Sequence, residues 1–282
     1  MSVSIFDTTK CQLGEGPLWH PLLKQFFWFD INAMQLLTKT ASGQRKVWQF
    51  DEHVSAAGWV DADTLLIVSE TAFFKFTIST GAQEILAPLE ADNPITRSND
   101  GRADPFGGMW IGTMGKQAEK HAGAIYRYYR GEVRTLYPNI TISNSICFAP
   151  DGRTAYFTDT PTKQIMRQTL DAQGWPIGDT EIFIDLNQAG FAPDGSVVDA
   201  EGCLWNAQWG ASRVARYDAN GLFLSAIDMP DAKQTTCPAF GGDDLTTLFC
   251  TSAADGDDSA NAGRTFSVKT DVKGQPEHQV IL

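Results

Sequence analysis

The sequence predicts an all-β fold, a six-bladed β-propeller with four antiparallel strands in each blade. Short apolar strands with a bulky central residue recur along the whole chain of 282 residues. A turn-rich segment precedes each of them, as in Pro150-Asp151-Gly152 or Asp199 to Gly202. Gly and Pro interrupt nearly every window that could otherwise show helical periodicity. Together these observations favour a repeat architecture built from β-strands.

The spacing of the repeated strands sets the number of blades. Their central residues lie 38, 44, 46, 49 and 44 residues apart, and they are Trp28, Leu66, Trp110, Tyr156, Trp205 and Phe249. Two further β-rich stretches follow each central strand, for example residues 123–128 and 132–137. Four strands in roughly 40–45 residues are typical of a propeller blade. We therefore expect residues 1–282 to form a single six-bladed domain.

A propeller must close its ring, because an open ring leaves two unpaired sheet edges. Two terminal segments could supply the outer strand of the last blade. Val3 to Phe6 precede the first repeat, and His278 to Leu282 follow the last one. The sequence does not choose between them.

Composition excludes several classes of partner and site. The formal net charge of −12 argues against binding to nucleic acid or to an anionic membrane surface. There is no apolar run long enough to span a membrane and no signal-peptide pattern at the N-terminus, so we expect a cytoplasmic protein. The five cysteines form no CxxC pair, and the four histidines form no zinc motif. We expect a monomer or a weak homo-oligomer.

Counting back from each central residue locates equivalent positions on the first strand of each blade, which lines the central channel of a propeller. These positions are Glu15, Ser55, Asn99, Asn144, Asp194 and Cys237. Four of the six carry a carboxylate or carboxamide group. Such oxygen ligands, without Cys or His, suit a hard divalent cation such as Ca, Mg or Mn, with Zn or Fe(II) also possible. By contrast, Asp104 and Asp199 lie at the following hairpin turns and are expected to be structural.

Several short motifs occur in a characteristic order. They are Leu13-Gly14-Glu15-Gly16-Pro17, Arg97-Ser98-Asn99-Asp100-Gly101, Gly112-Thr113-Met114, Ile142-Ser143-Asn144, Pro193-Asp194-Gly195 and Phe240-Gly241-Gly242. Over nearly the whole chain this series resembles the gluconolactonase/regucalcin (senescence marker protein) family. The resemblance implies a six-bladed propeller that holds one divalent metal ion, and in many members hydrolyses sugar lactones.

Matched to the family motifs, Glu15, Asn144 and Asp194 correspond to metal ligands, while Arg97 and Asn99 correspond to residues on the substrate side. Ser145 departs from the pattern, because many relatives have Gly at that position. The segment from Gly115 to Ala122 would loop over one face as a lid, and its Glu119 has no certain equivalent in the family.

The resemblance implies a divalent-metal-dependent hydrolase that opens an aldono lactone to the aldonic acid. Asp194 would accept a proton from the attacking water, and Arg97 and Asn99 would orient the sugar. Two alternatives remain open at this stage. The same Lewis acid could serve a phosphotriester or another ester, or the propeller could be a non-catalytic platform for a metal or a partner.

Overall fold

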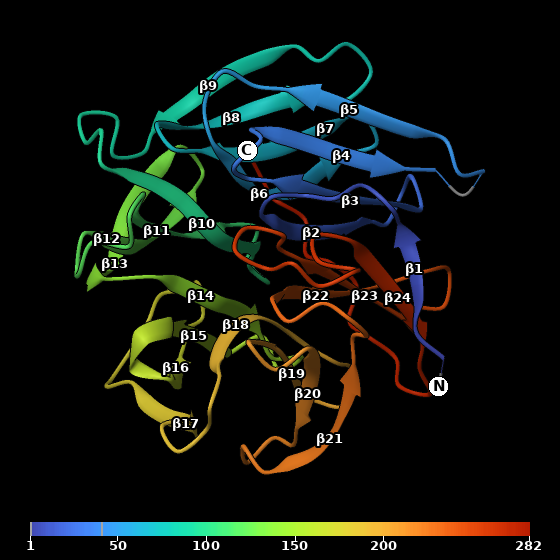
Figure 1. Ribbon diagram of the computed structural model, residues 1–282. Helices are drawn as coiled ribbons and strands as arrows, with labels where there is room; N and C mark the ends of the chain where they lie inside the picture. Colours follow the sequence, from blue (N-terminus) through green and yellow to red (C-terminus); the bar gives the residue numbers. More distant parts are fainter. Residues whose placement is uncertain (1, 41) are drawn as a thin grey trace.

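A computed structural model describes residues 2–40 and 42–282 of the chain. Within these residues it contains six four-stranded antiparallel sheets arranged as the blades of a propeller (Figure 1). The prediction of six blades with four strands each is therefore confirmed. The only helix in the described part of the chain is one 3-10 turn, Thr160–Thr162. No helix among the described residues is long and apolar enough to cross a membrane.

The strands follow the same order in each blade, from the channel outward. The innermost strands are β2 (Gly14–His20), β6 (Val54–Asp61), β10 (Thr96–Ala103), β14 (Ser143–Phe148), β18 (Ala192–Val198) and β22 (Thr235–Gly241). The second strands, which contain all six central residues of the repeats, are β3 (Gln25–Asp30), β7 (Thr64–Ser69), β11 (Met109–Gly115), β15 (Thr154–Asp159), β19 (Leu204–Trp209) and β23 (Thr247–Ser252).

The outer half of each blade is formed by two further strands. The third strands are β4 (Gln35–Lys39), β8 (Ala72–Thr77), β12 (Gly123–Tyr129), β16 (Gln164–Thr169), β20 (Arg213–Tyr217) and β24 (Thr265–Lys269). The outermost strands are β5 (Arg45–Gln49), β9 (Gln83–Pro88), β13 (Glu132–Ile140), β17 (Glu181–Asp185), β21 (Phe223–Asp228) and β1 (Ser4–Asp7).

The N-terminal strand β1 closes the ring. It pairs antiparallel with β24, with Ser4 opposite Ser267 and Ile5 opposite Phe266. The last blade is thus built from both ends of the described chain, and it has four strands like the other five blades. Of the two candidate segments, the N-terminal one is therefore the closing strand.

The C-terminal segment has a different position. The Gln275 amide donates to the carbonyl oxygens of Phe148 (3.1 Å) and Val198 (2.9 Å), at the far ends of β14 and β18. The Val280 N–H donates to the Trp59 carbonyl (2.9 Å). Glu277 pairs with Arg102 at 2.6 Å, and both side chains are at least nine-tenths buried. This segment therefore covers one end of the inner strands and leaves the other end for a site.

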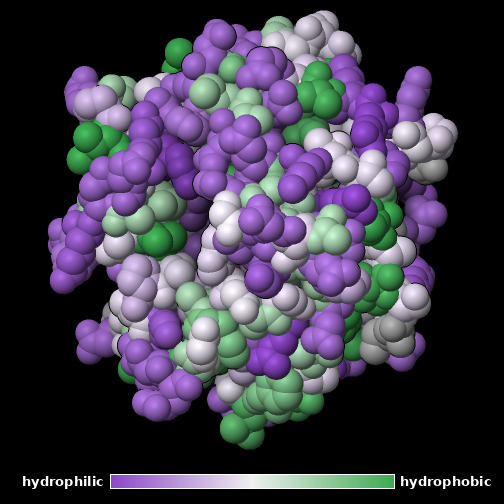
Figure 2. Space-filling view, viewed as in Figure 1, coloured by the Kyte–Doolittle hydropathy of each residue, from purple (hydrophilic) through white to green (hydrophobic). Residues whose placement is uncertain are grey.

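The core lies between adjacent blades. One cluster, for example, packs Phe27, Phe29 and Leu36 of the first blade against Leu65 and Ile67 of the second, all fully buried. Space-filling colouring shows a mainly hydrophilic face, with hydrophobic atoms gathered at the lower rim where β21 lies (Figures 1 and 2). The apolar packing between neighbouring blades thus holds the inner strands around the channel.

Candidate metal and substrate site

Every inner strand breaks its regular pairing at the same level of the channel. The pairing with the second strand shifts between Glu15 and Leu18 in β2, and between Ser98 and Gly101 in β10. Equivalent shifts in β14, β18, β6 and β22 follow Asn144, Pro193, Val54 and Thr235. A bulge turns a side chain out of the alternating pattern of a strand, and bulges are common beside active sites. Here they gather polar side chains at one channel mouth.

A cavity of about 670 Å³ opens at this mouth. It is lined by all five residues that the sequence analysis selected as site residues, which are Glu15, Arg97, Asn99, Asn144 and Asp194. These side chains come from β2, β10, β14 and β18, so four blades converge on one space. All five residues are at least nine-tenths buried.

The other two channel positions do not line this cavity. Ser55 donates from its hydroxyl to Ser98 Oγ (2.7 Å) and ties β6 to β10. Cys237 is buried against Gly195, where a Cβ atom would collide with the cysteine side chain. Glycine directly after Asp194 therefore allows β18 and β22 to approach each other.

Asn144 is held with its carbonyl oxygen toward the site. Its Nδ2 donates to Thr160 Oγ1 (2.9 Å), and that hydroxyl donates in turn to the Pro193 carbonyl (3.1 Å). Asn144 Oδ1 accepts from Asn99 Nδ2 (3.2 Å). The amide orientation is thus set by its partners, and the oxygen remains available as a ligand.

Glu15 and Asp194 are buried carboxylates that repel each other. Burial and the nearby charge of Asp100 raise the pKa of Glu15 to about 8. Burial and the charge of Glu15 hold the pKa of Asp194 well above its usual range. Of the two Glu15 oxygens, Oε2 accepts the Gly16 N–H (2.9 Å). A divalent cation between these groups would offset their repulsion, so this donor set fits a hard metal ion.

Asp100 is a third buried carboxylate that the sequence analysis did not select. Burial raises its pKa to about 6, while the Ile146 N–H, which it accepts at 2.7 Å, opposes that shift. It lies next to Asn99 within the same bulge, so its side chain leaves the strand in another direction. The hydrogen bond to Ile146 joins β10 to β14 directly beneath the site.

Arg97 and Asn99 form a connected pair on the cavity wall. Arg97 Nη1 donates to Asn99 Oδ1 (2.7 Å) and to the Ser98 carbonyl (2.8 Å). Asn99 Nδ2 donates to the Ser143 carbonyl (2.7 Å). Burial lowers the pKa of Arg97 to about 10, against the opposing charges of Glu15 and Glu70, so this side chain remains a cation near neutral pH.

Ser145 adopts a left-handed backbone conformation, with φ of 59°. That conformation explains why glycine suits this position in the family pattern. The serine hydroxyl donates to the Asp194 carbonyl and accepts from Ser196 Oγ (3.0 Å). The departure from glycine thus adds a direct tie between β14 and the strand that carries Asp194.

The cavity is also lined by residues that the register count did not find, because they lie in loops beyond the inner strands. They include His53, Lys116, Gln117, Thr160 and Asp255. Trp209, at the end of β19, lines the same space. Glu119 instead folds back on its own loop, where it accepts the Gln117 N–H (3.0 Å).

Another cluster of possible metal ligands lies elsewhere, at a hairpin turn. Asp199, Glu201 and Cys203 have ligand atoms within 4.8 Å of one another. Arg216 already pairs with both carboxylates, at 2.8 and 2.6 Å. Asp199 also accepts the Cys203 N–H and the Trp205 indole N–H, each at 2.9 Å. This cluster, like Asp104 with its Arg127 partner at 2.7 Å, stabilises a turn, as the sequence indicated.

Comparisons with known proteins place these observations in a family. The L-arabinolactonase of Azospirillum brasilense is 34% identical over 95% of this chain and 91% of its own length. Pentonolactonase XacC of Haloferax volcanii is 32% identical over 98% of this chain and 97% of its own length.

A crystal structure of a calcium-binding protein, regucalcin, from Agrobacterium tumefaciens superimposes with a TM-score of 0.96 at 43% identity, covering 99% of this chain and 97% of that one. The family described as the SMP-30/Gluconolactonase/LRE-like region matches residues 13–254. The resemblance seen in the sequence motifs is therefore confirmed, and the chain belongs to the SMP-30/gluconolactonase/LRE-like family.

Proposed function

We propose that this protein hydrolyses the lactone ring of a sugar (aldono) lactone to the aldonic acid, with one divalent cation held by Glu15, Asn144 and Asp194. The observation that carries the proposal is that these three residues, each with an oxygen that can bind a metal, line one cavity together with Arg97 and Asn99, and that all five are buried. Relatives named as sugar lactonases support lactone hydrolysis as the reaction class.

The cation would be Ca, Zn, Mn, Mg or Fe(II), all of which accept oxygen ligands. When bound, it would supply Lewis-acid stabilisation of the negative charge that develops on the lactone carbonyl oxygen. Glu15, Asn144 and Asp194 would supply three oxygen ligands to the cation, and the cavity that they line would admit the substrate.

Asp194 is proposed to accept the proton of the attacking water. Its side chain lines the cavity together with the other proposed ligands, Glu15 and Asn144. As a ligand of the cation its carboxylate would be ionised, and an ionised carboxylate next to the attacking water can accept a proton from it. If an Asp194→Asn variant kept both its metal and its full rate, Asp194 would be excluded as the proton acceptor.

Arg97 and Asn99 are proposed to orient the substrate. The Asn99 amide is fixed, because its Nδ2 donates to the Ser143 carbonyl and to Asn144 Oδ1 while its Oδ1 accepts from Arg97 Nη1. Arg97 Nε and Nη2 have no hydrogen-bond partner among the described residues and can donate to sugar hydroxyl or carbonyl oxygens. Since Arg97 is already held by Nη1, binding a substrate in this way costs little ordering, which favours a productive geometry. A polyhydroxylated substrate matches this pair better than an apolar ester does.

The test is hydrolysis of a panel of pentono- and hexonolactones, as 1,4 and 1,5 rings, followed with a pH indicator against the spontaneous background. Chelator-treated and metal-restored protein would be compared with Asp194→Ala and with a control, Asp258→Ala. Asp258 is exposed and lies in the loop that carries the cavity residue Asp255. We expect metal-restored turnover that is lost in Asp194→Ala and kept in Asp258→Ala.

The contrary result is equally clear. No rate above background on any sugar lactone, with metal bound in the protein, would exclude the proposed reaction. Phosphotriesters and other esters would then be assayed with the same variants, and a non-catalytic binding role would be the remaining alternative.

A further inference from the structure

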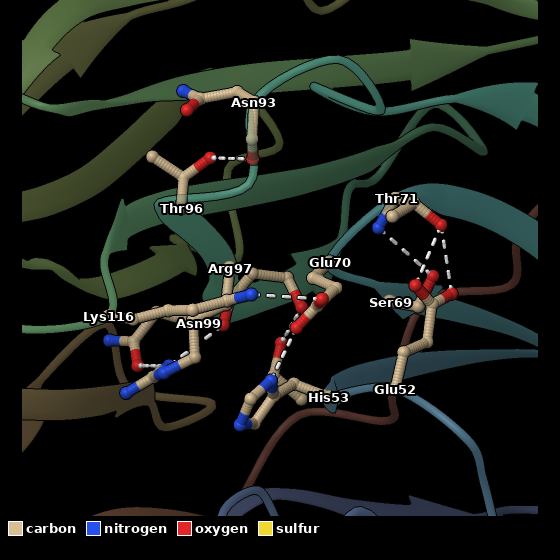
Figure 3. A network of polar contacts seen from close by, with 12 residues as sticks. Glu52, His53, Ser69, Glu70, Thr71, Asn93, Thr96, Arg97, Asn99 and Lys116 are labelled. Atoms are coloured by element: carbon tan, nitrogen blue, oxygen red, sulfur yellow. Dashed lines mark hydrogen bonds and ion pairs between the residues drawn. The ribbon is translucent and has the colours of Figure 1, made fainter.

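A basic side chain extends the cavity wall beyond Arg97. Lys116 directly follows β11 and lines the cavity, and its Nζ pairs with Glu70 Oε1 at 3.0 Å. Glu70 directly follows β7, and its other oxygen pairs with Nδ1 of His53, a second cavity residue. Figure 3 shows Glu70 between Lys116 and His53, with Arg97 and Asn99 beside Lys116. Loops of two different blades thus meet through one carboxylate.

The backbone around this group is also fixed. The Lys116 N–H donates to the Ile95 carbonyl at 2.8 Å, and the Glu70 N–H donates to the His53 carbonyl at 2.9 Å. The side chains are only partly buried, with 29% of Lys116 and 17% of Glu70 exposed. Lys116 is therefore held in place and still accessible from the cavity.

This wall has more hydrogen-bond donors than acceptors. A lysine ammonium carries three donors, and Glu70 is the one hydrogen-bond partner of Lys116 Nζ among the described residues. Arg97 donates within the described chain from Nη1, while Nε and Nη2 take no partner there. Glu70 pairs with both Lys116 and His53, while Arg97 is influenced by the charges of Glu15 and Glu70 and keeps two nitrogens without a partner among the described residues.

A donor-rich wall suits a group that only accepts hydrogen bonds. A sugar hydroxyl is both donor and acceptor, whereas an ionised carboxylate or phosphate is an acceptor at every oxygen. Hydrogen bonds from lysine or arginine to such anions are among the strong ones. The surrounding protein carries a net charge of −12, so local cations are needed to admit an anion.

We propose that Lys116, held by Glu70 beside His53, is a specificity-determining residue that binds an anionic group on the substrate, at the end remote from the lactone carbonyl. The preferred substrate is then an acidic sugar lactone, with a carboxylate or a phosphate on its exocyclic carbon. This inference rests on the proposed function for the reaction, but it also predicts binding that does not require turnover.

The kinetic test uses lactones of equal ring size that differ at one carbon. Glucono-1,4-lactone is compared with glucaro-1,4-lactone for the carboxylate, and glucono-1,5-lactone with 6-phosphoglucono-1,5-lactone for the phosphate. The variants are Lys116→Gln and the control Lys120→Gln, which makes the same charge change at an exposed position of the same loop.

For the preferred anion, we expect Lys116→Gln to lower the ratio of kcat/KM, anionic over neutral lactone, at least tenfold. The loss should lie mainly in KM, and Lys120→Gln should leave the ratio within twofold. The pair that responds identifies the anion as a carboxylate or a phosphate. A wild-type enzyme that rejects both acidic lactones, or a variant that loses both members of a pair equally, would overturn the inference while leaving lactone hydrolysis intact.

Equilibrium binding separates this inference from the proposed reaction. Calorimetric titration of metal-loaded protein with glucarate, 6-phosphogluconate and gluconate measures recognition of the ring-opened acids without catalysis. We expect at least one of the two acids with a second anionic group, glucarate or 6-phosphogluconate, to bind at least tenfold more tightly than gluconate, and Lys116→Gln to remove that preference. Equal affinity for all three acids in the wild type would refute the subsite even if no lactone were hydrolysed.

Discussion

Without the proposed divalent cation, the stability of the protein should depend strongly on pH, because Glu15 and Asp194 are buried together. Burial and neighbouring charge raise the pKa of Glu15 from 4.5 to about 8 in the folded chain. Between these two values the folded state keeps a proton that the unfolded state has lost. The free energy of unfolding therefore falls as pH rises through this window, and the loss is complete above the folded pKa.

The magnitude follows from the shift. For Glu15, each pH unit within the window lowers the free energy of unfolding by about 1.4 kcal/mol, so this residue alone should cost the metal-free protein about 4 kcal/mol between pH 5 and pH 8. Asp194 and Asp100, whose pKa values burial also raises, add to this loss. Unfolding entropy of about 2.1 cal/mol/K per residue gives about 0.6 kcal/mol/K for a chain of 282 residues. The melting temperature of the chelator-treated protein should thus fall by at least about 7 °C over this range.

The assay is thermal unfolding at pH 5 and pH 8, with chelator or with a saturating divalent cation. The cation needs ionised carboxylates, so it should raise the melting temperature more at pH 8 than at pH 5. A Glu15→Gln variant should remove the part of the pH dependence that Glu15 contributes and weaken the response to metal, while Asp194 and Asp100 keep their own contributions. A flat melting temperature in the chelator-treated wild type, or an unchanged slope in Glu15→Gln, would refute the reasoning.

Three further changes test the site and the frame around it. Arg97→Lys should reduce kcat/KM for the best lactone by about 10- to 100-fold without moving the melting temperature by more than ~2 °C, because one ammonium cannot replace a planar guanidinium; an unchanged rate would remove Arg97 from substrate orientation. Arg102→Met should lower the free energy of unfolding, measured with denaturant, by about 3 kcal/mol, because it leaves Glu277 buried without a counter-charge. The double variant Arg102→Met with Glu277→Gln should recover part of that loss. Deletion of residues 1–7 removes β1 and exposes the edge of β24, so the truncated chain should aggregate in light scattering where the full chain does not.

Much of the fold could be predicted because each blade repeats one strand pattern. The central residues of the repeats all lie in second strands, from Trp28 in β3 to Phe249 in β23. Ring closure could not be predicted, because both terminal segments are short and partly apolar, so either could serve as an edge strand. The difference lies in tertiary contacts: β24 offers its free edge to β1, while Glu277 is held at the channel by Arg102.

The inner-strand residues of the candidate site could be found by counting, because every inner strand carries its register shift at an equivalent place relative to the second strand. Lys116, His53 and Glu70 were not found, because each lies beyond the end of a strand and no period applies there. Their contacts join loops of neighbouring blades, so they depend on how the blades pack together, which the pattern along the chain does not specify.

The two ends of the channel differ in how their buried charges are neutralised. At the covered end, Arg102 meets Glu277 at 2.6 Å, so the buried charges neutralise each other. At the open end, Glu15, Asp100 and Asp194 share a small buried volume, and burial raises the pKa of each. A cluster of that kind opposes folding unless protons or a cation neutralise it. The register shifts beside this cluster recur in every inner strand. The cluster of carboxylates is therefore a regular feature of the channel mouth and not the result of one irregular blade. A propeller that only scaffolded a partner would have no use for carboxylates at this position, which is the physical reason to look for the cation first.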